Sequence, residues 1–274
     1  MELNELKSKI KVEPVGKMES EIEREGKKIK HVNRIVHLPA GLKLEDGLIA
    51  RAVTLKEMTG EQENEMQTGG AQAINKLLKG CIESIEGVDV VTDDMILDML
   101  ASDRDFLFVK IRQLNFGDDV RVETACPKCK NAQTVNYKIS DLDVKVWPDE
   151  FPRVIEGIEV AQGVANIASG EMQNVFSVAF ATGHDQMFVL KKGKEYNEVS
   201  LLLSQVIKKA GNMKSISYDM ALKMWTKDRL MINKAMSEVQ SGIDDGVEVI
   251  CGDKNCKHKF KVNVVNSENF FSLT

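Results

Sequence analysis

The chain has 274 residues and a net charge of −5, with 43% hydrophobic and 29% charged residues. This composition is enough for one large core or two smaller ones. The acidic balance argues against a protein that binds nucleic acid through a broad basic face. No stretch is long and apolar enough to span a membrane. Because residues 1–11 lack the apolar segment of a signal peptide, we expect synthesis in a reducing cytoplasm.

The N-terminal third is predicted to contain an arm, a strand and two helices. Residues 1–32 are rich in both acidic and basic side chains, which predicts a solvated charged arm or frayed helix, or an arm that orders against a partner. Residues 47–55 alternate apolar and polar side chains as a strand does. Thr59 and Gln62 have capping-box spacing for a short helix. Residues 71–85 keep apolar side chains at helical spacing.

Two more helices are predicted before the first cysteine loop. Thr92 can cap the first and Ser102 the second, and Gly117 ends the second. Strands are expected over 120–124 and 134–139. Elements in the same order are predicted over 198–210, 218–225, 226–240, 247–250 and 260–265.

An internal repeat explains that order. When the chain is shifted by 125 residues, 14 of the 50 residues at 77–126 coincide without a gap, against about three expected by chance. The matched residues of the first copy are Leu77, Leu78, Ile82, Asp94, Met95, Leu97, Met99, Asp103, Arg104, Gly117, Asp119, Val122, Glu123 and Cys126. We interpret this agreement as a duplication.

The predicted fold class is α+β. It comprises two related repeats, each of a few helices plus a zinc-knuckle β-hairpin, joined in a pseudo-twofold arrangement. We expect a charged arm at 1–32, a first repeat at 33–146 and a second repeat at 157–274. The linker between them, at 147–156, contains Pro148 and Pro152.

Four of the five cysteines lie in two loops, Cys126-Pro127-Lys128-Cys129 and Cys251-Gly252-Asp253-Lys254-Asn255-Cys256. A tight turn between strands points two thiolates to one side, and zinc in structural sites takes four ligands tetrahedrally. Two such loops at equivalent places predict one structural zinc bound by Cys126, Cys129, Cys251 and Cys256. All four positions would then be filled, leaving none for a catalytic water.

A redox pair, disulfides and loss of the metal are the alternatives to a zinc site. A redox pair is disfavoured because Cys126 does not begin a helix, and a disulfide within each loop is disfavoured in a reducing compartment. Loss of the metal, with the cysteines merely inherited, stays open. His258 can replace one thiolate as a ligand or lie beside the site. Cys81 is expected to pack in a core.

Little else in the sequence suggests catalysis. Phosphate-binding, dinucleotide-binding and metalloprotease motifs are missing from the sequence. Gly183-His184-Asp185 is predicted to be a turn rather than part of a catalytic site. The Asp-Arg pairs at Asp103 and Asp228 are read as helix-start residues with an arginine that ties the helix to a neighbour, although a partner surface is the alternative. We therefore expect no enzyme and no small-molecule substrate.

Several of these segments together resemble the T4-type baseplate hub protein family of tailed bacteriophages. They are His37-Leu38-Pro39-Ala40-Gly41, residues 47–53, the helix at Asp103-Arg104 and the Cys126–Cys129 turn, and the resemblance covers roughly residues 33–145. It implies a non-enzymatic structural protein of the contractile-tail baseplate, made in the host cytoplasm and contacting other tail and hub proteins.

Two alternatives remain at this stage. The first is a transient chaperone of hub or tail assembly that is absent from the mature particle, which the same resemblance allows. The second is a zinc-ribbon nucleic-acid or transcription accessory protein. It draws on the lysines of the second cysteine loop but conflicts with the overall acidity and with the expectation of no nucleic-acid partner.

Overall fold

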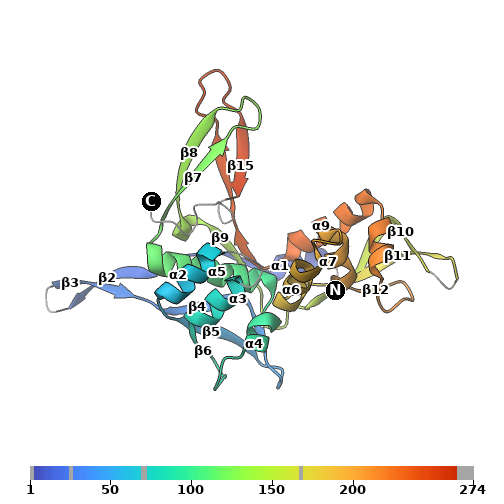
Figure 1. Ribbon diagram of the computed structural model, residues 1–274, viewed down its shortest axis with the longest axis horizontal. Helices are drawn as coiled ribbons and strands as arrows, with labels where there is room; N and C mark the ends of the chain where they lie inside the picture. Colours follow the sequence, from blue (N-terminus) through green and yellow to red (C-terminus); the bar gives the residue numbers. More distant parts are fainter. Residues whose placement is uncertain (1–2, 25–26, 69–72, 167–168, 264–274) are drawn as a thin grey trace.

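Two bodies and a pair of projecting hairpins make up the computed structural model of the protein, which describes residues 3–24, 27–68, 73–166 and 169–263 (Figure 1). Helices and strands are mixed throughout the chain, which confirms the predicted α+β class. The first body runs from β4 to α5 and the second from β10 to α9. The two hairpins stand side by side above the first body.

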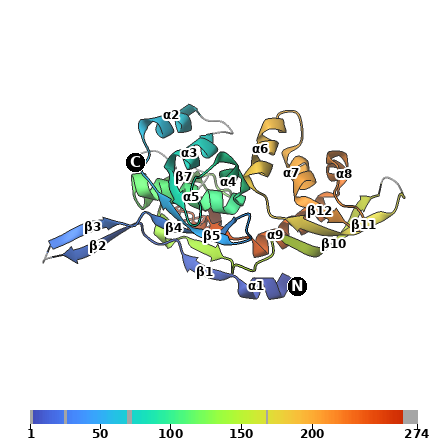
Figure 2. The same ribbon diagram turned by 90° about the horizontal axis from the view of Figure 1, so that it is seen from below.

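The first body is a three-stranded antiparallel sheet with helices on one side (Figure 2). Its strands, in the order β4-β5-β6, are β4 (Ile35–Lys43), β5 (Ile49–Leu55) and β6 (Ile82–Ile85). Its helices are α2 (Gly60–Thr68), α3 (Ala73–Cys81), α4 (Asp93–Asp98) and α5 (Ala101–Phe116). The buried aliphatic side chains of both layers form one core.

The helix predicted over 71–85 is too long at its C-terminal end. Helix α3 stops at Cys81, and β6 follows at once and pairs with β5. Ile82 and Ile85 are both buried, and their spacing of three fits a helix as well as the two ends of a four-residue strand. The ladder with β5, which the local sequence does not reveal, decides between them.

The second body has the same order of elements. Its sheet is β10 (Val154–Ala165), β11 (Met172–Ala179) and β12 (Ile207–Ala210), in the order β10-β11-β12. Its helices are α6 (Gly183–Lys192), α7 (Glu198–Val206), α8 (Tyr218–Lys223) and α9 (Thr226–Val239). The helix predicted over 198–210 again ends early, because β12 replaces its last turn. Strand β10 begins at Val154, inside the segment predicted as a linker.

The N-terminal segment carries regular structure where a solvated arm or frayed helix was predicted. It forms α1 (Leu3–Lys9), β1 (Lys11–Pro14), β2 (Glu19–Arg24) and β3 (Lys27–Val32). Leu6 is buried in the core of the second body, and Val15 and Met18 are buried in that of the first. Strand β1 pairs with β9 (Asp143–Val146), which also pairs with β13 (Gly242–Asp244). Buried apolar residues at wide intervals thus hold a charge-rich segment in place.

The two bodies meet around Trp147. Its ring stacks on Phe151 at 4.3 Å and meets the edge of Phe180 at 4.6 Å between centroids. Its Nε1 donates to the Val239 carbonyl at 2.8 Å, which joins the connecting segment to the end of α9. Arg153 donates to the carbonyl oxygens of Ala40 and Gly41 in β4. The connection between the bodies is therefore packed.

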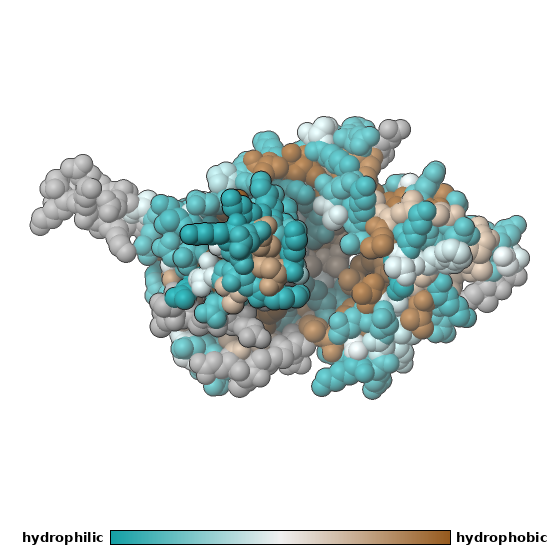
Figure 3. All heavy atoms as spheres, turned by 90° about the horizontal axis from the view of Figure 1, so that it is seen from above, coloured by the Kyte–Doolittle hydropathy of each residue, from teal (hydrophilic) through white to brown (hydrophobic). Residues whose placement is uncertain are grey.

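The projecting hairpins are β7 (Asp119–Ala125) with β8 (Ala132–Lys138), and β14 (Gly246–Ile250) with β15 (Lys259–Asn263). A short 3-10 turn, Ile139–Asp141, follows β8. Seen from above, the projecting hairpins are mostly hydrophilic at the surface, and more apolar surface lies over the half of the molecule that holds β10 to α9 (Figure 3). None of the helices in the described ranges is long and apolar enough to cross a membrane.

Candidate metal centre

The cysteine loops lie at the tips of the two hairpins, more than 120 residues apart in the chain but adjacent in space (Figure 1). Valines hold the hairpins against each other below the loops. Val122 of β7, Val249 of β14 and Val262 of β15 are buried and belong to the core of the first body. The alternation of buried and exposed residues along these strands therefore fixes which face of each hairpin meets the other.

The first loop is a tight turn closed by backbone hydrogen bonds. Cys126 N–H donates to the Asn131 carbonyl at 2.9 Å, and Lys130 N–H donates to the Cys126 carbonyl at 2.8 Å. Lys130 has φ of 62°, a left-handed conformation that side chains rarely adopt. These constraints turn the chain so that Cys126 is buried and Cys129 lies at the surface.

The second loop is two residues longer and closes in the same way. Cys251 N–H donates to the His258 carbonyl at 2.9 Å, and Lys257 N–H donates to the Asp253 carbonyl at 3.2 Å. Lys257, the residue after the second cysteine, has φ of 43°, as Lys130 does at the matching place in the first loop. The insertion therefore leaves the closure of the turn unchanged.

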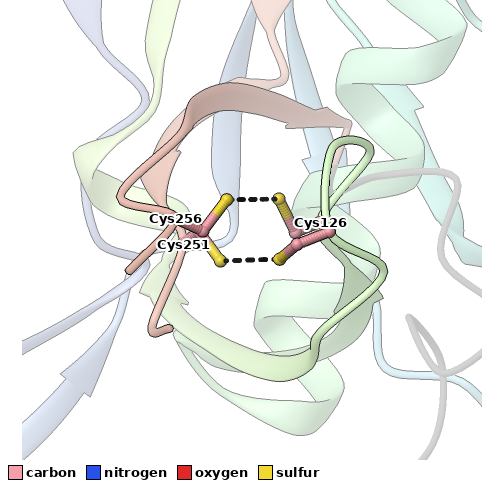
Figure 4. A group of neighbouring side chains, drawn as sticks. Cys126, Cys251 and Cys256 are labelled. Atoms are coloured by element: carbon pink, nitrogen blue, oxygen red, sulfur yellow. Dashed lines mark hydrogen bonds between the residues drawn. The ribbon is translucent and has the colours of Figure 1, made fainter. Parts of the chain in front are cut away.

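The four sulfur atoms come together between the loops (Figure 4). All four lie within 4.8 Å of one another. Cys126 Sγ is 3.9 Å from Cys256 Sγ, and Cys129 Sγ is 3.5 Å from Cys251 Sγ. The sulfurs of a zinc tetrathiolate are about 3.8 Å apart, given Zn–S bonds of about 2.3 Å. The donor set and its spacing therefore fit a tetrahedral metal site that both hairpins share.

The same distances bear on the alternative of disulfides. Sulfur atoms in a disulfide are about 2.05 Å apart, and all four cysteines are free thiols. The short contacts join one loop to the other, whereas the disulfides considered from the sequence were within each loop. None of the four sulfurs is bonded to another, and the two shortest contacts each pair a cysteine of one loop with a cysteine of the other.

The pKa values of Cys126, Cys251 and Cys256 are shifted by their surroundings. Burial opposes ionisation of Cys126, but the backbone N–H groups of Cys129 and Lys128 donate to its sulfur and lower its pKa to about 7. The pKa of Cys251 is raised to about 12 and that of Cys256 is also raised. Backbone N–H groups of Asp253 and His258 favour those thiolates, but burial and the neighbouring sulfurs outweigh them. Several thiolates this close together repel one another, and a bound dication offsets that repulsion.

Gln133 was not singled out from the sequence, yet it links the two hairpins next to the cysteines. Its Oε1 accepts from Gly252 N–H at 2.9 Å, and its Nε2 lies 3.5 Å from the Ile250 carbonyl. A polar residue on an exposed-looking strand gives no local signal of such a contact. The contact holds the second loop against β8.

His258 and Cys81 lie outside the sulfur cluster. His258 stacks on Phe260 with 6.2 Å between ring centroids, and its backbone N–H donates to Cys256 Sγ. It is therefore a neighbour of the cluster in this arrangement. Cys81 is fully buried in the core of the first body, and burial raises its pKa to about 11. Its thiol is protonated at neutral pH.

The predicted Asp-Arg pairs contain two fully buried aspartates. Asp103 accepts from Ala40 N–H at 2.8 Å, at an irregularity in β4. Asp228 accepts from the N–H groups of Ala161, Gln162 and Gly163 at an irregularity in β10. Each aspartate thus satisfies the backbone of a bulged strand, a role that the interpretation as helix-start residues did not include.

The Gly183-His184-Asp185 segment is a helix N-terminus, and the prediction of a turn there is wrong. Thr182 and Asp185 form a reciprocal capping box at the start of α6. His184 Nε2 lies 3.1 Å from Asp98 Oδ1 at the end of α4. This histidine therefore contributes to the contact between the two bodies.

The chain was also compared with known proteins. The family described as T4 bacteriophage base plate protein matches residues 33–272, a span that contains both bodies and both cysteine loops. No curated protein and no solved structure matches the chain. Because the family match covers most of the chain, it confirms the predicted resemblance. The protein belongs to the T4 bacteriophage base plate protein family, whose members are components of phage tails that assemble with other tail proteins.

Proposed function

We propose that this chain is a non-enzymatic structural protein of the baseplate hub. It would be built from two copies of one unit, at 33–146 and 157–274, and stapled by a structural zinc ion on Cys126, Cys129, Cys251 and Cys256. The observation that carries the proposal is the cluster of four thiols, two from each unit, within a chain that matches the baseplate family from 33 to 272. The arm at 1–32 and the linker at 147–156, whose buried apolar residues belong to the cores of the bodies, would hold the two units together.

Matching details in the two bodies support the duplication. Both sheets have the same strand order, and both continue into paired helices, a third strand and two more helices. Thr92 and Ser217 cap the equivalent helices α4 and α8, accepting from Met95 and Met220 N–H. These positions differ by 125, the shift that aligns the sequences. Helix caps at equivalent positions of the two bodies support a common origin for the two units.

The buried aspartates support it further. Asp103 and Asp228 occupy equivalent places, and each binds the backbone of the first strand of its own unit. Gly41 and Gly163 lie in those bulges with φ of 80° and 82°. An added Cβ would lie 2.4 Å from Ile49 at the first glycine and 2.0 Å from the Gln173 carbonyl oxygen at the second. Both copies therefore need glycine at the bulge.

Zinc is favoured among metals by the donor set. Four thiolates in tetrahedral spacing suit zinc or an iron–sulfur cluster, whereas calcium and magnesium prefer oxygen. Individual sulfurs 3.5 to 3.9 Å apart match a single central ion. The two loops would act as zinc knuckles, with Lys130 and Lys257 closing them. Since all four ligands are protein side chains, the ion would staple the hairpins and leave no position for substrate.

Charge along the hairpins favours contact with protein over nucleic acid. Lys138 pairs with Asp119 at 3.2 Å, and Glu248 lies opposite Lys261 in the β14–β15 register. The lysines of the second hairpin are therefore interspersed with acids. Phosphate binding requires a continuous basic surface. We accordingly propose no nucleic-acid partner and no small-molecule substrate.

Quantitative mass spectrometry of purified mature phage particles tests the structural role. A structural protein is expected at a fixed ratio to other tail proteins. Its presence only in lysate, bound to unassembled hub proteins, would instead identify a transient assembly chaperone. Its absence from both fractions would contradict the baseplate role itself.

A further inference from the structure

We infer that the second body carries a docking surface for the first body of another copy of this chain, so that copies join head to tail. The inference rests on the two-unit part of the proposed function and not on the metal. The surface, called here the Trp225 face, consists of Leu222, Lys223, Trp225 and Arg229 at the junction of α8 and α9. The element that would dock on it, called the α2 corner, consists of Thr59, Gly60, Glu61 and Glu63 at the start of α2.

The internal contact between the two bodies provides the template. The start of α6 packs against α4 and α5 of the first body. Ala101 N–H donates to the Ala181 carbonyl at 2.8 Å, and Gly183 N–H donates to the Met99 carbonyl at 3.0 Å. Leu100 forms a bridge with Thr182 and is only 6% exposed. Leu100, at the junction of α4 and α5, is thus covered by the second body.

The equivalent junction in the second body is uncovered. A shift of 125 converts Leu100 into Trp225, which is 63% exposed, and Leu97 into Leu222, which is 45% exposed. Arg104 corresponds to Arg229. Arg104 donates to Asn75 and Arg229 donates to Ser200, and these two partners are also 125 residues apart. A tryptophan and a leucine this exposed beside an arginine are typical of a protein interface.

The docking element also has an unused equivalent. A shift of 123 aligns Thr182-Gly183 at the start of α6 with Thr59-Gly60 at the start of α2. Both threonine side chains accept a backbone N–H of the first turn, from Asp185 and from Glu61. At Gly183 an added Cβ would lie 2.9 Å from the Leu97 backbone, which explains the glycine. At Gly60 no atom of the described residues lies within 4 Å of an added Cβ. The glycine at position 60 therefore fits a contact with a second copy, as Gly183 fits the internal contact.

Charge complementarity identifies the partner as a second copy. In the internal contact His184 pairs with Asp98, and Arg104 Nε donates to Gln186 Oε1 at 2.9 Å. In the proposed contact the equivalent residues are Glu61 with Lys223, and Glu63 with Arg229. Both pairs are oppositely charged: the first differs from its internal equivalent at both residues, whereas the second keeps the arginine and has Glu63 where the internal contact has Gln186. Glu61, Glu63 and Lys223 are exposed and Arg229 is half-buried, so the acidic α2 corner and the basic Trp225 face match each other in charge.

The contact is heterologous, because each copy offers one surface of each kind. Such an interface builds rings if its rotation closes and filaments if it does not. A copy whose α2 corner is blocked still offers the Trp225 face, and a copy whose Trp225 face is blocked still offers the corner. This asymmetry gives the inference a test that a symmetric dimer could not pass.

Sedimentation velocity of the full-length, metal-loaded chain is the experiment. The wild type is expected to grow beyond a dimer as concentration rises. Trp225→Glu is expected to weaken association by roughly thirtyfold or more, as for loss of an interface hot spot, and Gly60→Leu to do the same. Both sites are exposed, so the fold should be kept, which circular dichroism and zinc content check. Val90→Glu, at a site 71% exposed elsewhere, is the matched control and should associate as wild type.

Mixing gives the decisive outcome. Trp225→Glu and Gly60→Leu are expected to be monomeric alone and to form one dimer, and nothing larger, when combined. Lys223→Glu should weaken association, and adding Glu61→Lys in the same chain should restore it. A wild type that stays monomeric at every concentration, or variants that assemble as wild type does, would overturn the inference. Either result leaves the particle-retention and zinc tests unaffected, so the two proposals fail separately.

Discussion

The bodies and the paired hairpins are held together by different means. The first body encloses a core of large aliphatic side chains, with Leu38, Leu77 and Leu107 fully buried. The hairpins bury mainly valines, and they share them across two strand pairs. Short hairpins with so little core are marginally stable alone. The cysteine cluster therefore lies in the part of the molecule that most needs an additional link.

The largest expected effect is the loss of hairpin stability when the metal is removed. Removing metal from the loaded protein with a chelator should expose the amides of β7, β8, β14 and β15 to hydrogen exchange, while α3 and α5 stay protected. Structural zinc contributes up to about 10–16 kcal/mol in small zinc-finger peptides, which is an upper bound here. Mass-detected hydrogen exchange with and without chelator measures it. Equal loss of protection in hairpins and bodies would contradict the division.

A substitution in the second body is expected to destabilise that body without affecting the metal site. Asp228→Ala leaves the N–H groups of Ala161, Gln162 and Gly163 without their carboxylate. The free energy of unfolding should fall by about 3 kcal/mol, because buried donors lose their partner. Urea denaturation measures the change, with the exposed Glu156→Ala as control. Metal content should not change, and a loss of metal in Asp228→Ala would link the body to the hairpins after all.

The sequence predicts the cysteine site more completely than it predicts the strands of the two bodies. Alignment of Cys126 with Cys251 in the repeat was enough to predict which four thiols meet. The same alignment found Asp103 and Asp228 but not their partners, because a bulged strand is defined by its hydrogen bonds and not by its residue pattern. Where strands β6 and β12 lie, the sequence predicts the ends of helices, since Ile82 and Ile85 fit either structure. The hairpin β10–β11 has irregular register and was not predicted.

A pH effect of comparable size is expected from the buried Asp103. Burial raises the pKa of Asp103 to about 6, against the hydrogen bond from Ala40 and the charges of Arg153 and Arg51. An unfolded aspartate has a pKa of about 3.9. The folded state therefore binds the proton more tightly, so stability should fall as pH rises from about 4 to about 6 and then level off. The total change is about 3 kcal/mol.

Asp103→Asn should abolish that fall. Denaturation of both proteins across this pH range measures the difference between them, so that any pH dependence from the thiols cancels. The wild type is expected to lose stability relative to the variant as pH rises through the range. Parallel profiles would show that Asp103 does not titrate in this interval.

The smallest expected effect concerns the contact between the hairpins beside the cysteines. Gln133→Ala removes the acceptor of Gly252 N–H and should cost about 1 kcal/mol. Asn136→Ala, at an exposed position further along β8, is the control. Rates of metal release to a chelator provide the measurement, and faster release from Gln133→Ala alone is expected. An unchanged rate of metal release would show that the metal and the valines, and not Gln133, hold the second loop in place.

The most direct test of the shared site is the metal content of purified protein and of two single variants. We expect about one zinc per chain, and we expect Cys126→Ser and Cys251→Ser to lose zinc and hairpin protection to a similar degree, although they lie in different hairpins. Two zinc ions per chain, or a variant that keeps the metal while its counterpart loses it, would contradict a single site formed by both loops.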